Sequence, residues 1–114
     1  MPTWEDAVKI ATAFPGVEEY TAYKTPALRV RKKFIARLRT NPEGLVLRVI
    51  DLLEAEALLK GQPEIFFSTP HYVGYPYVLV HLSRIGRREL SELIEDAWRT
   101  QAPKRLIAEY DEKG

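Results

Sequence analysis

Arginine residues at alternating positions are the side chains of this sequence whose type and spacing could do chemistry. Residues 27–38, ALRVRKKFIARL, alternate apolar and basic residues. Since successive side chains of a β-strand point to opposite faces, this alternation predicts one apolar and one basic face. Guanidinium groups suit phosphate because their planar fork donates two hydrogen bonds. The residues predicted to contact a nucleic acid are Arg29, Arg31, Lys32, Lys33, Arg37, Arg39 and, from a later strand, Arg48.

The second half of this stretch predicts which apolar side chains are buried. After the lysine pair, the apolar parity contains Phe34, Ala36 and Leu38. Ile35 falls on the parity of the arginines. Because parity decides the face of a regular strand, we expect Phe34 in the core and Ile35 on the basic face.

The charge of the chain is strongly segregated. Between Lys24 and Arg48 there are eight basic residues and one acidic residue, a local charge of +7, whereas the rest of the chain carries −6 and the net charge is +1. A local positive field of this kind favours an anionic partner such as DNA. The alternative is a solvated sheet face on which long basic side chains cover apolar surface. The sequence leaves both interpretations open.

A second candidate site is the aromatic loop between Thr69 and His81. Its polar-tipped rings could line a cleft near Lys24 and Arg48 for a small anion or a peptide, or could belong to a protein-interaction module. The alternative is that the rings cap the end of the sheet and make only local hydrogen bonds. The candidate pocket residues are Tyr23, Lys24, His71, Tyr72, Tyr75 and Tyr77.

The sequence contains no motif typical of a catalytic site or a metal-binding site. The chain has no cysteine, which excludes disulfides and thiolate ligands. Its two histidines, His71 and His81, have no acidic partners at ligand spacing. No serine lies in a nucleophile-elbow motif, and the sequence has no glycine-rich phosphate loop. We therefore expect a protein that is not an enzyme and that uses no metal or cofactor.

Length and composition indicate a globular protein. With 114 residues, of which 46% are hydrophobic and 29% charged, the chain is expected to form one domain over residues 1–114. No apolar run approaches the roughly 20 residues that a membrane span needs. The first ten residues include acids and lack the basic start of a signal peptide. These features predict a cytoplasmic protein that does not enter a membrane.

Three helices are predicted from caps, apolar spacing and helix-breaking residues. The first begins after Thr3 and ends at Pro15-Gly16. The second begins after Asp51 and ends at Gly61. The third covers the C-terminal part of the chain, where Pro103 should kink or restart it.

The strands are grouped, which favours an α+β fold. Residues 17–26 are expected to connect the first helix to the sheet, and residues 40–44 to form a turn. The predicted strands are residues 27–31, 33–39, 45–50, 64–67 and 77–82. The resulting order, α-β-β-β-α-β-β-α, predicts one antiparallel sheet with helices mainly on one face.

Short motifs in a fixed order cover most of the chain. They are FPGVEE at 14–19, TP at 25–26, LRV at 28–30, KFIARL at 33–38, TPHY at 69–72, GYP at 74–76, VLV at 78–80 and DAW at 96–98. In these motifs the chain resembles the MmcQ/YjbR family of small bacterial proteins. Lys32 departs from the family, which often has glycine in this hairpin turn.

The resemblance implies both a fold and a partner. The family's fold is similar to that of frataxin-like and secretion-chaperone-like proteins, a curved antiparallel sheet backed by helices. Family members are commonly labelled DNA-binding, and the family has no established catalytic residues. The resemblance therefore favours a monomer or homodimer that contacts the phosphate backbone of DNA.

Overall fold

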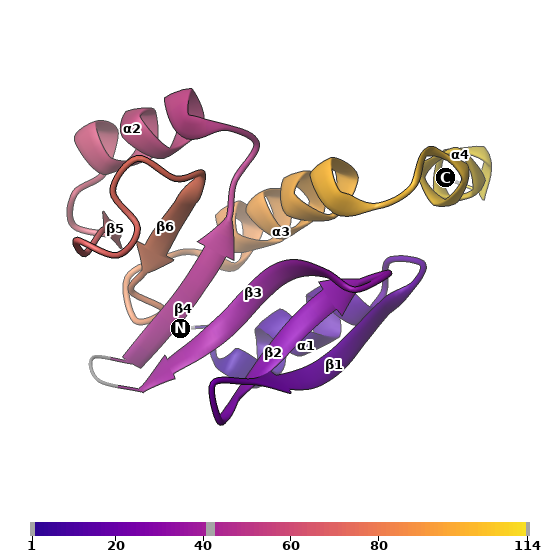
Figure 1. The fold of residues 1–114 in the computed structure, drawn as a ribbon, viewed down its shortest axis with the longest axis horizontal. Helices are drawn as coiled ribbons and strands as arrows, with labels where there is room; N and C mark the ends of the chain where they lie inside the picture. Colours follow the sequence, from indigo (N-terminus) through magenta and orange to yellow (C-terminus); the bar gives the residue numbers. More distant parts are fainter. Residues whose placement is uncertain (1, 41–42, 114) are drawn as a thin grey trace.

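The computed structural model describes residues 2–40 and 43–113 as helices and strands around one antiparallel sheet (Figure 1). The helices are α1 (Trp4–Thr12), α2 (Leu52–Gly61), α3 (Arg87–Gln101) and α4 (Lys104–Lys113). The strands are β1 (Val17–Ala22), β2 (Thr25–Val30), β3 (Lys33–Thr40), β4 (Glu43–Arg48), β5 (Phe66–Phe67) and β6 (Tyr77–Val80). Their order in the sheet is β1-β2-β3-β4-β6-β5, with all neighbours antiparallel. The predicted α+β class is confirmed.

The prediction that residues 17–26 only connect the first helix to the sheet is wrong, because residues 17–22 form the edge strand β1. This strand pairs with β2 from Val17 opposite Val30 to Ala22 opposite Thr25. Its sequence, VEEYTA, is largely polar and partly exposed, as suits an edge strand that is paired on one side. This segment is a strand because it pairs with β2 across a two-residue turn. It has no apolar run from which a strand could be predicted.

Other strand boundaries differ from the predicted ones by a few residues. β2 already begins at Thr25, since Thr25 and Pro26 lie opposite the end of β1. Of the predicted turn at residues 40–44, residues 41–42 lie outside the described residues, and Gly44 belongs to β4. The strands are therefore longer on this side of the sheet than the turn residues suggest.

The hydrophobic core lies between the sheet and the helices α1 and α3. α1 packs against β1 and α3, and α3 packs against β3 and β4; Figure 1 shows α1 behind β1 and β2. Trp98 of α3 is completely buried, stacks on Phe14 with ring centroids 5.1 Å apart, and donates its Nε1–H to the carbonyl oxygen of Pro15 at 2.9 Å. Leu28 and Val30 are completely buried, as the alternating pattern predicts.

A β-bulge in β3 reverses the predicted positions of Phe34 and Ile35. Leu28 of β2 lies opposite Ala36, but the next residue, Arg29, lies opposite Phe34, so Ile35 is the extra residue. Ile35 is completely buried in the core. Phe34 shares the face of Arg29 instead. The prediction for both residues is wrong because the extra residue in β3 moves the side chains that precede it in the strand to the opposite face of the sheet.

Pro103 divides the C-terminal helix, as predicted. α3 ends at Gln101, and Ala102 has the extended backbone (φ −75°, ψ 148°) that proline favours in the residue before it. α4 then packs against the start of the chain. The ring of Tyr110 lies 5.2 Å from the rings of both Phe14 and Trp98. The last helix therefore completes the aromatic part of the core.

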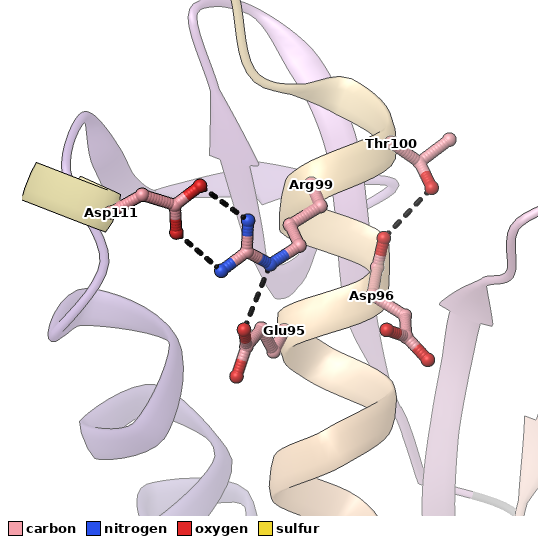
Figure 2. A network of polar contacts seen from close by, with 5 residues as sticks. All are labelled: Glu95, Asp96, Arg99, Thr100 and Asp111. Carbon is pink, nitrogen blue, oxygen red and sulfur yellow. Dashed lines mark hydrogen bonds and ion pairs between the residues drawn. The ribbon is translucent and has the colours of Figure 1, made fainter. Parts of the chain in front are cut away.

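Arg99 of α3 binds α4 through the carboxylate of Asp111, while Glu95 of α3 orients the Arg99 guanidinium (Figure 2). Its Nη1 and Nη2 donate to Asp111 at 3.2 and 2.8 Å, and its Nε donates to Glu95 at 2.8 Å. The hydrogen bonds to Asp111 and Glu95 raise the pKa of Arg99, and the same bond from Arg99 lowers the pKa of Asp111 below the ordinary 3.8. A carboxylate with a lowered folded-state pKa stabilises the fold above its unfolded-state pKa, and the contribution is lost as the pH falls through the folded-state value.

Replacing Asp111 with asparagine is therefore expected to lower the urea midpoint of unfolding at pH 7, because the bidentate contact to Arg99 is lost. At an acidic pH below the folded-state pKa of Asp111, both proteins should unfold at nearly the same urea concentration, since Asp111 is then protonated in the wild type as well. Circular dichroism at both pH values measures the difference. The control is Glu112→Gln, since Glu112 is exposed and makes no ion pair within the described residues. An equal loss at both pH values would contradict this role of the Asp111 charge.

Candidate functional site

The face of the sheet opposite α1 and α3, here called the outer face, carries four of the predicted basic residues. These are Arg29, Arg37, Arg39 and Arg48. Arg37 is central and lies opposite Val46 of β4. By the strand register, Arg29 and Arg48 lie on the side of Arg37 nearer the β2–β3 turn, and Arg39 lies on the other side. The alternation read from the sequence thus places these four arginines on one face, as predicted.

Each of these arginines lies over an aromatic ring. The guanidinium carbon of Arg29 is 4.5 Å from the ring centre of Tyr20, that of Arg37 5.4 Å from Tyr23, that of Arg39 5.6 Å from Phe67 and that of Arg48 6.0 Å from Tyr77. A guanidinium over a ring keeps N–H groups at its edge for a phosphate or carboxylate. The outer face is therefore a mixed surface of cations and rings.

Arg29 and Arg48 are oriented by hydrogen bonds of their Nε–H groups within the protein. Arg29 donates its Nε–H to a carboxylate oxygen of Glu18 at 2.7 Å, on the neighbouring strand β1. Arg48 donates its Nε–H to the carbonyl oxygen of Val49 at 2.8 Å. Because a guanidinium has several N–H donors, each contact orients the side chain and leaves donors for a ligand.

The remaining basic residues predicted to bind lie at the β2–β3 turn. Arg31 and Lys32 form the turn, with φ of 48° and 69°, and Lys33 begins β3 opposite Val30. All three basic side chains are exposed. The prediction that Arg31 lies on the basic face is wrong, because β2 ends at Val30 and the chain reverses there.

Both two-residue turns at the ends of β2 use left-handed backbone without glycine. Tyr23 and Lys24, between β1 and β2, have φ of 52° and 65°. Such turns favour Asn-Gly, because other residues cost about 1–2 kcal/mol each in this region. Strained positions that carry a ring or a cation are more typical of functional residues than of residues selected for stability.

A pocket of about 340 Å³ opens on the outer face beside Arg37. It is lined by Tyr20, Ala22, Tyr23, Phe34, Arg37, Val46, Tyr72 and Tyr77. Arg37 belongs to the first predicted site, whereas Tyr23, Tyr72 and Tyr77 belong to the second. The structure therefore joins the two predicted sites into one.

Three residues of the predicted aromatic site lie elsewhere in the described structure. His71 and Lys24 are exposed and do not line the pocket, and Tyr75 lines a smaller cavity of about 100 Å³ against α2. Conversely, the sequence analysis missed Tyr20 and Phe34. Tyr20 is the single aromatic residue of the sequence at 17–22, VEEYTA, so no local pattern signals that its ring lines a pocket. Nothing in the sequence signals the bulge that turns Phe34 outward.

Aromatic edges and hydroxyl groups define the chemistry of the pocket. The ring of Tyr77 meets the rings of Phe34 and Tyr72 edge-on, with centroids 5.8 and 5.9 Å apart. Arg37 donates from Nη2 to the Tyr72 hydroxyl oxygen at 2.8 Å. Burial raises the pKa of Tyr20, so its hydroxyl stays protonated at neutral pH. The pocket thus offers ring surfaces and hydrogen-bond donors, which suit a flat ligand with acceptor atoms.

Residues 2–40 and 43–113 contain neither a metal-binding cluster nor a membrane-spanning helix. Among them, no three or more histidine, aspartate or glutamate side chains gather closely enough to hold a metal ion. Within the same ranges, no helix is both long and apolar enough to cross a bilayer.

Comparison with known proteins identifies relatives over nearly the whole chain. A sequence model described as YjbR matches residues 12–100. The uncharacterized proteins Mb2600 of Mycobacterium bovis and Rv2570 of Mycobacterium tuberculosis are each 33% identical over 124 residues, covering 96% of this chain and 96% of the relative. The crystal structure of Deinococcus radiodurans protein DR2400, with a DUF419 domain, matches with a TM-score of 0.73 at 20% identity, covering 86% of this chain and 77% of that one. The structural likeness shows the fold alone, and the sequence matches confirm the resemblance inferred from the motifs.

Proposed function

This chain belongs to the YjbR family, and we propose that it binds DNA through the outer face of its sheet. The observation that carries the proposal is that each of the four outer-face arginines lies over an aromatic ring. Proteins that bind single strands combine cations for the phosphates with rings on which bases stack. The outer face offers both kinds of group within the width of a few strands.

The charge distribution supports the same proposal. The segment that carries the four arginines has a local charge of +7, whereas the rest of the chain is acidic. Phosphate contacts supply most of the affinity of such an interface and carry no sequence information. Arg29 and Arg48 on one side of Arg37, with Arg39 on the other, form a track of guanidiniums across β2, β3 and β4. We therefore expect binding that is electrostatic and weakly dependent on sequence.

Binding of a labelled single-stranded oligonucleotide should weaken roughly 50-fold between about 50 and 200 mM salt if about four phosphates are neutralised. In the triple variant Arg29→Gln, Arg39→Gln and Arg48→Gln, one contact remains and the same change should weaken binding only roughly threefold. These three arginines do not line the pocket, so the variant tests the phosphate contacts separately from it. Fluorescence anisotropy measures both slopes.

The matched control removes the same charge from the helical side of the molecule. It is the triple variant Arg84→Gln, Arg87→Gln and Arg88→Gln, whose side chains are exposed near the start of α3. This control should keep the steep salt dependence of the wild type. Equal effects of the two triple variants, or no binding by folded wild-type protein at low salt, would overturn the proposal.

A further inference from the structure

The pocket beside Arg37 differs from the rest of the outer face because it is hollow and lined mainly by rings. Its volume of about 340 Å³ is near the lower end of the range for ligand pockets. Its floor includes Val46, whose side chain is 1% exposed. A duplex presents its bases stacked and paired, so no base of a duplex can enter such a hollow without being flipped out. A single strand exposes the faces and edges of its bases.

From this geometry we propose that the pocket holds one unstacked base of a single DNA strand, an inference that rests on the proposed function. Tyr77, with the edges of Phe34 and Tyr72 against it, forms the inner aromatic wall. Arg37 and the Tyr72 hydroxyl, 2.8 Å apart, present polar groups to the edge of the base. A base has both the flat surface and the acceptor atoms that this combination fits.

Tyr23 supplies the outer wall. Its side chain is 88% exposed although a tyrosine ring is largely apolar, and its backbone is held at a left-handed φ of 52°. The ring lies at the rim of the pocket, 5.4 Å from the guanidinium carbon of Arg37. A base that enters the pocket would cover this ring and remove its apolar surface from water. The left-handed backbone of Tyr23 costs free energy in the free protein, and in the complex it places the ring against the base.

The flanking arginines place the phosphates of the same strand. Arg29 and Arg48 lie on one side of Arg37, and Arg39 lies on the other. Phosphates before and after the inserted base therefore meet guanidiniums on either side of the pocket. This arrangement selects single strands over duplexes without selecting a sequence, since every base has a face that can stack.

The test compares three probes of equal length: a single-stranded oligonucleotide, a strand in which every nucleotide is abasic, and a duplex. Wild-type protein should bind the single strand at least fivefold more tightly than the other two, which is the effect expected from one stacked base. Tyr23→Asn should bind the single strand at the level of the abasic strand, with an unchanged salt slope. Asparagine tolerates the left-handed backbone, so the variant should fold. Tyr75→Asn is the control, because Tyr75 is exposed and lines a different cavity.

The outcomes separate the two proposals. If wild-type protein binds the single strand and the abasic strand equally, the pocket holds no base, while phosphate binding by the outer face stands. If none of the three probes binds, both proposals fail together. A titration with mononucleotides, followed by NMR shifts of pocket residues, distinguishes a free nucleotide from a strand. Mononucleotide shifts without any strand binding would overturn the single-strand proposal and assign the pocket to a small ligand.

Discussion

Replacing Trp98 with alanine is expected to lower the free energy of unfolding by about 3–5 kcal/mol. Trp98 is completely buried, and its ring contacts both Phe14 and Tyr110, with centroids 5.1 and 5.2 Å away. The truncation removes this packing, leaves a cavity and deprives the Pro15 carbonyl oxygen of its hydrogen bond. Because α4 packs on the same rings, we expect its amide protons to lose protection as well. Urea unfolding followed by circular dichroism measures the change.

Trp98→Phe separates packing from hydrogen bonding if the alanine variant does not fold. Phenylalanine keeps a ring between Phe14 and Tyr110 but cannot donate to Pro15, so we expect a loss of about 1–3 kcal/mol. Leu53→Ala is the surface control, since Leu53 is 75% exposed, and it should change the stability by less than about 0.5 kcal/mol. A Trp98→Ala variant as stable as this control would contradict the proposed aromatic cluster.

Replacing Gly44 with alanine is expected to destabilise the protein by about 3 kcal/mol, the upper end of the usual range for overpacking. Gly44 belongs to β4, and a Cβ added there would overlap the carbonyl oxygen of Val80 and lie 3.2 Å from its carbonyl carbon. The obstacle is the backbone of the neighbouring strand β6, which cannot move away without disturbing the pairing of Leu45 with Val80. Urea unfolding again measures the loss.

Gly61→Ala is the matched control and should have the opposite sign. Gly61 is the last residue of α2, and no atom would lie within 4 Å of a Cβ added there. Its φ is not among the positive values of the described glycines, so alanine fits and should stabilise the helix by up to about 1 kcal/mol. The prediction that α2 ends at Gly61 is confirmed, although Gly61 is the last helical residue and not a left-handed residue that follows the helix. If both variants changed stability equally, close strand contact would not explain Gly44.

Local patterns in the sequence predicted much of the molecule. Thr3 forms the expected cap of α1, accepting a hydrogen bond from the backbone N–H of Asp6 at 3.2 Å. Asp51 caps α2 in the same way, accepting from Glu54 at 2.9 Å. Pro103 divides the last helix. Each of these features depends on residues within about one helical turn, so a short stretch of sequence contains all the information needed.

The candidate site was predicted in two parts. The outer-face arginines followed from strand alternation, and the aromatic loop followed from its composition. That Arg37 and Tyr72, 35 positions apart, share a hydrogen bond was not predictable. The contact requires β3, β4 and β6 to be paired in one particular register, which no local pattern specifies.

The sequence by itself determined the α+β class, the family and the common face of Arg29, Arg37, Arg39 and Arg48. These properties follow from motif order, helix caps and the two-residue period of a strand, which can all be recognised in the sequence itself. Only the tertiary structure decided that residues 17–22 form an edge strand, that Ile35 is bulged into the core with Phe34 outside, and that the rings close a pocket around Arg37. The physical reason is that strand pairing and burial are settled between segments far apart in the chain, where the free energy of the whole core outweighs local preference.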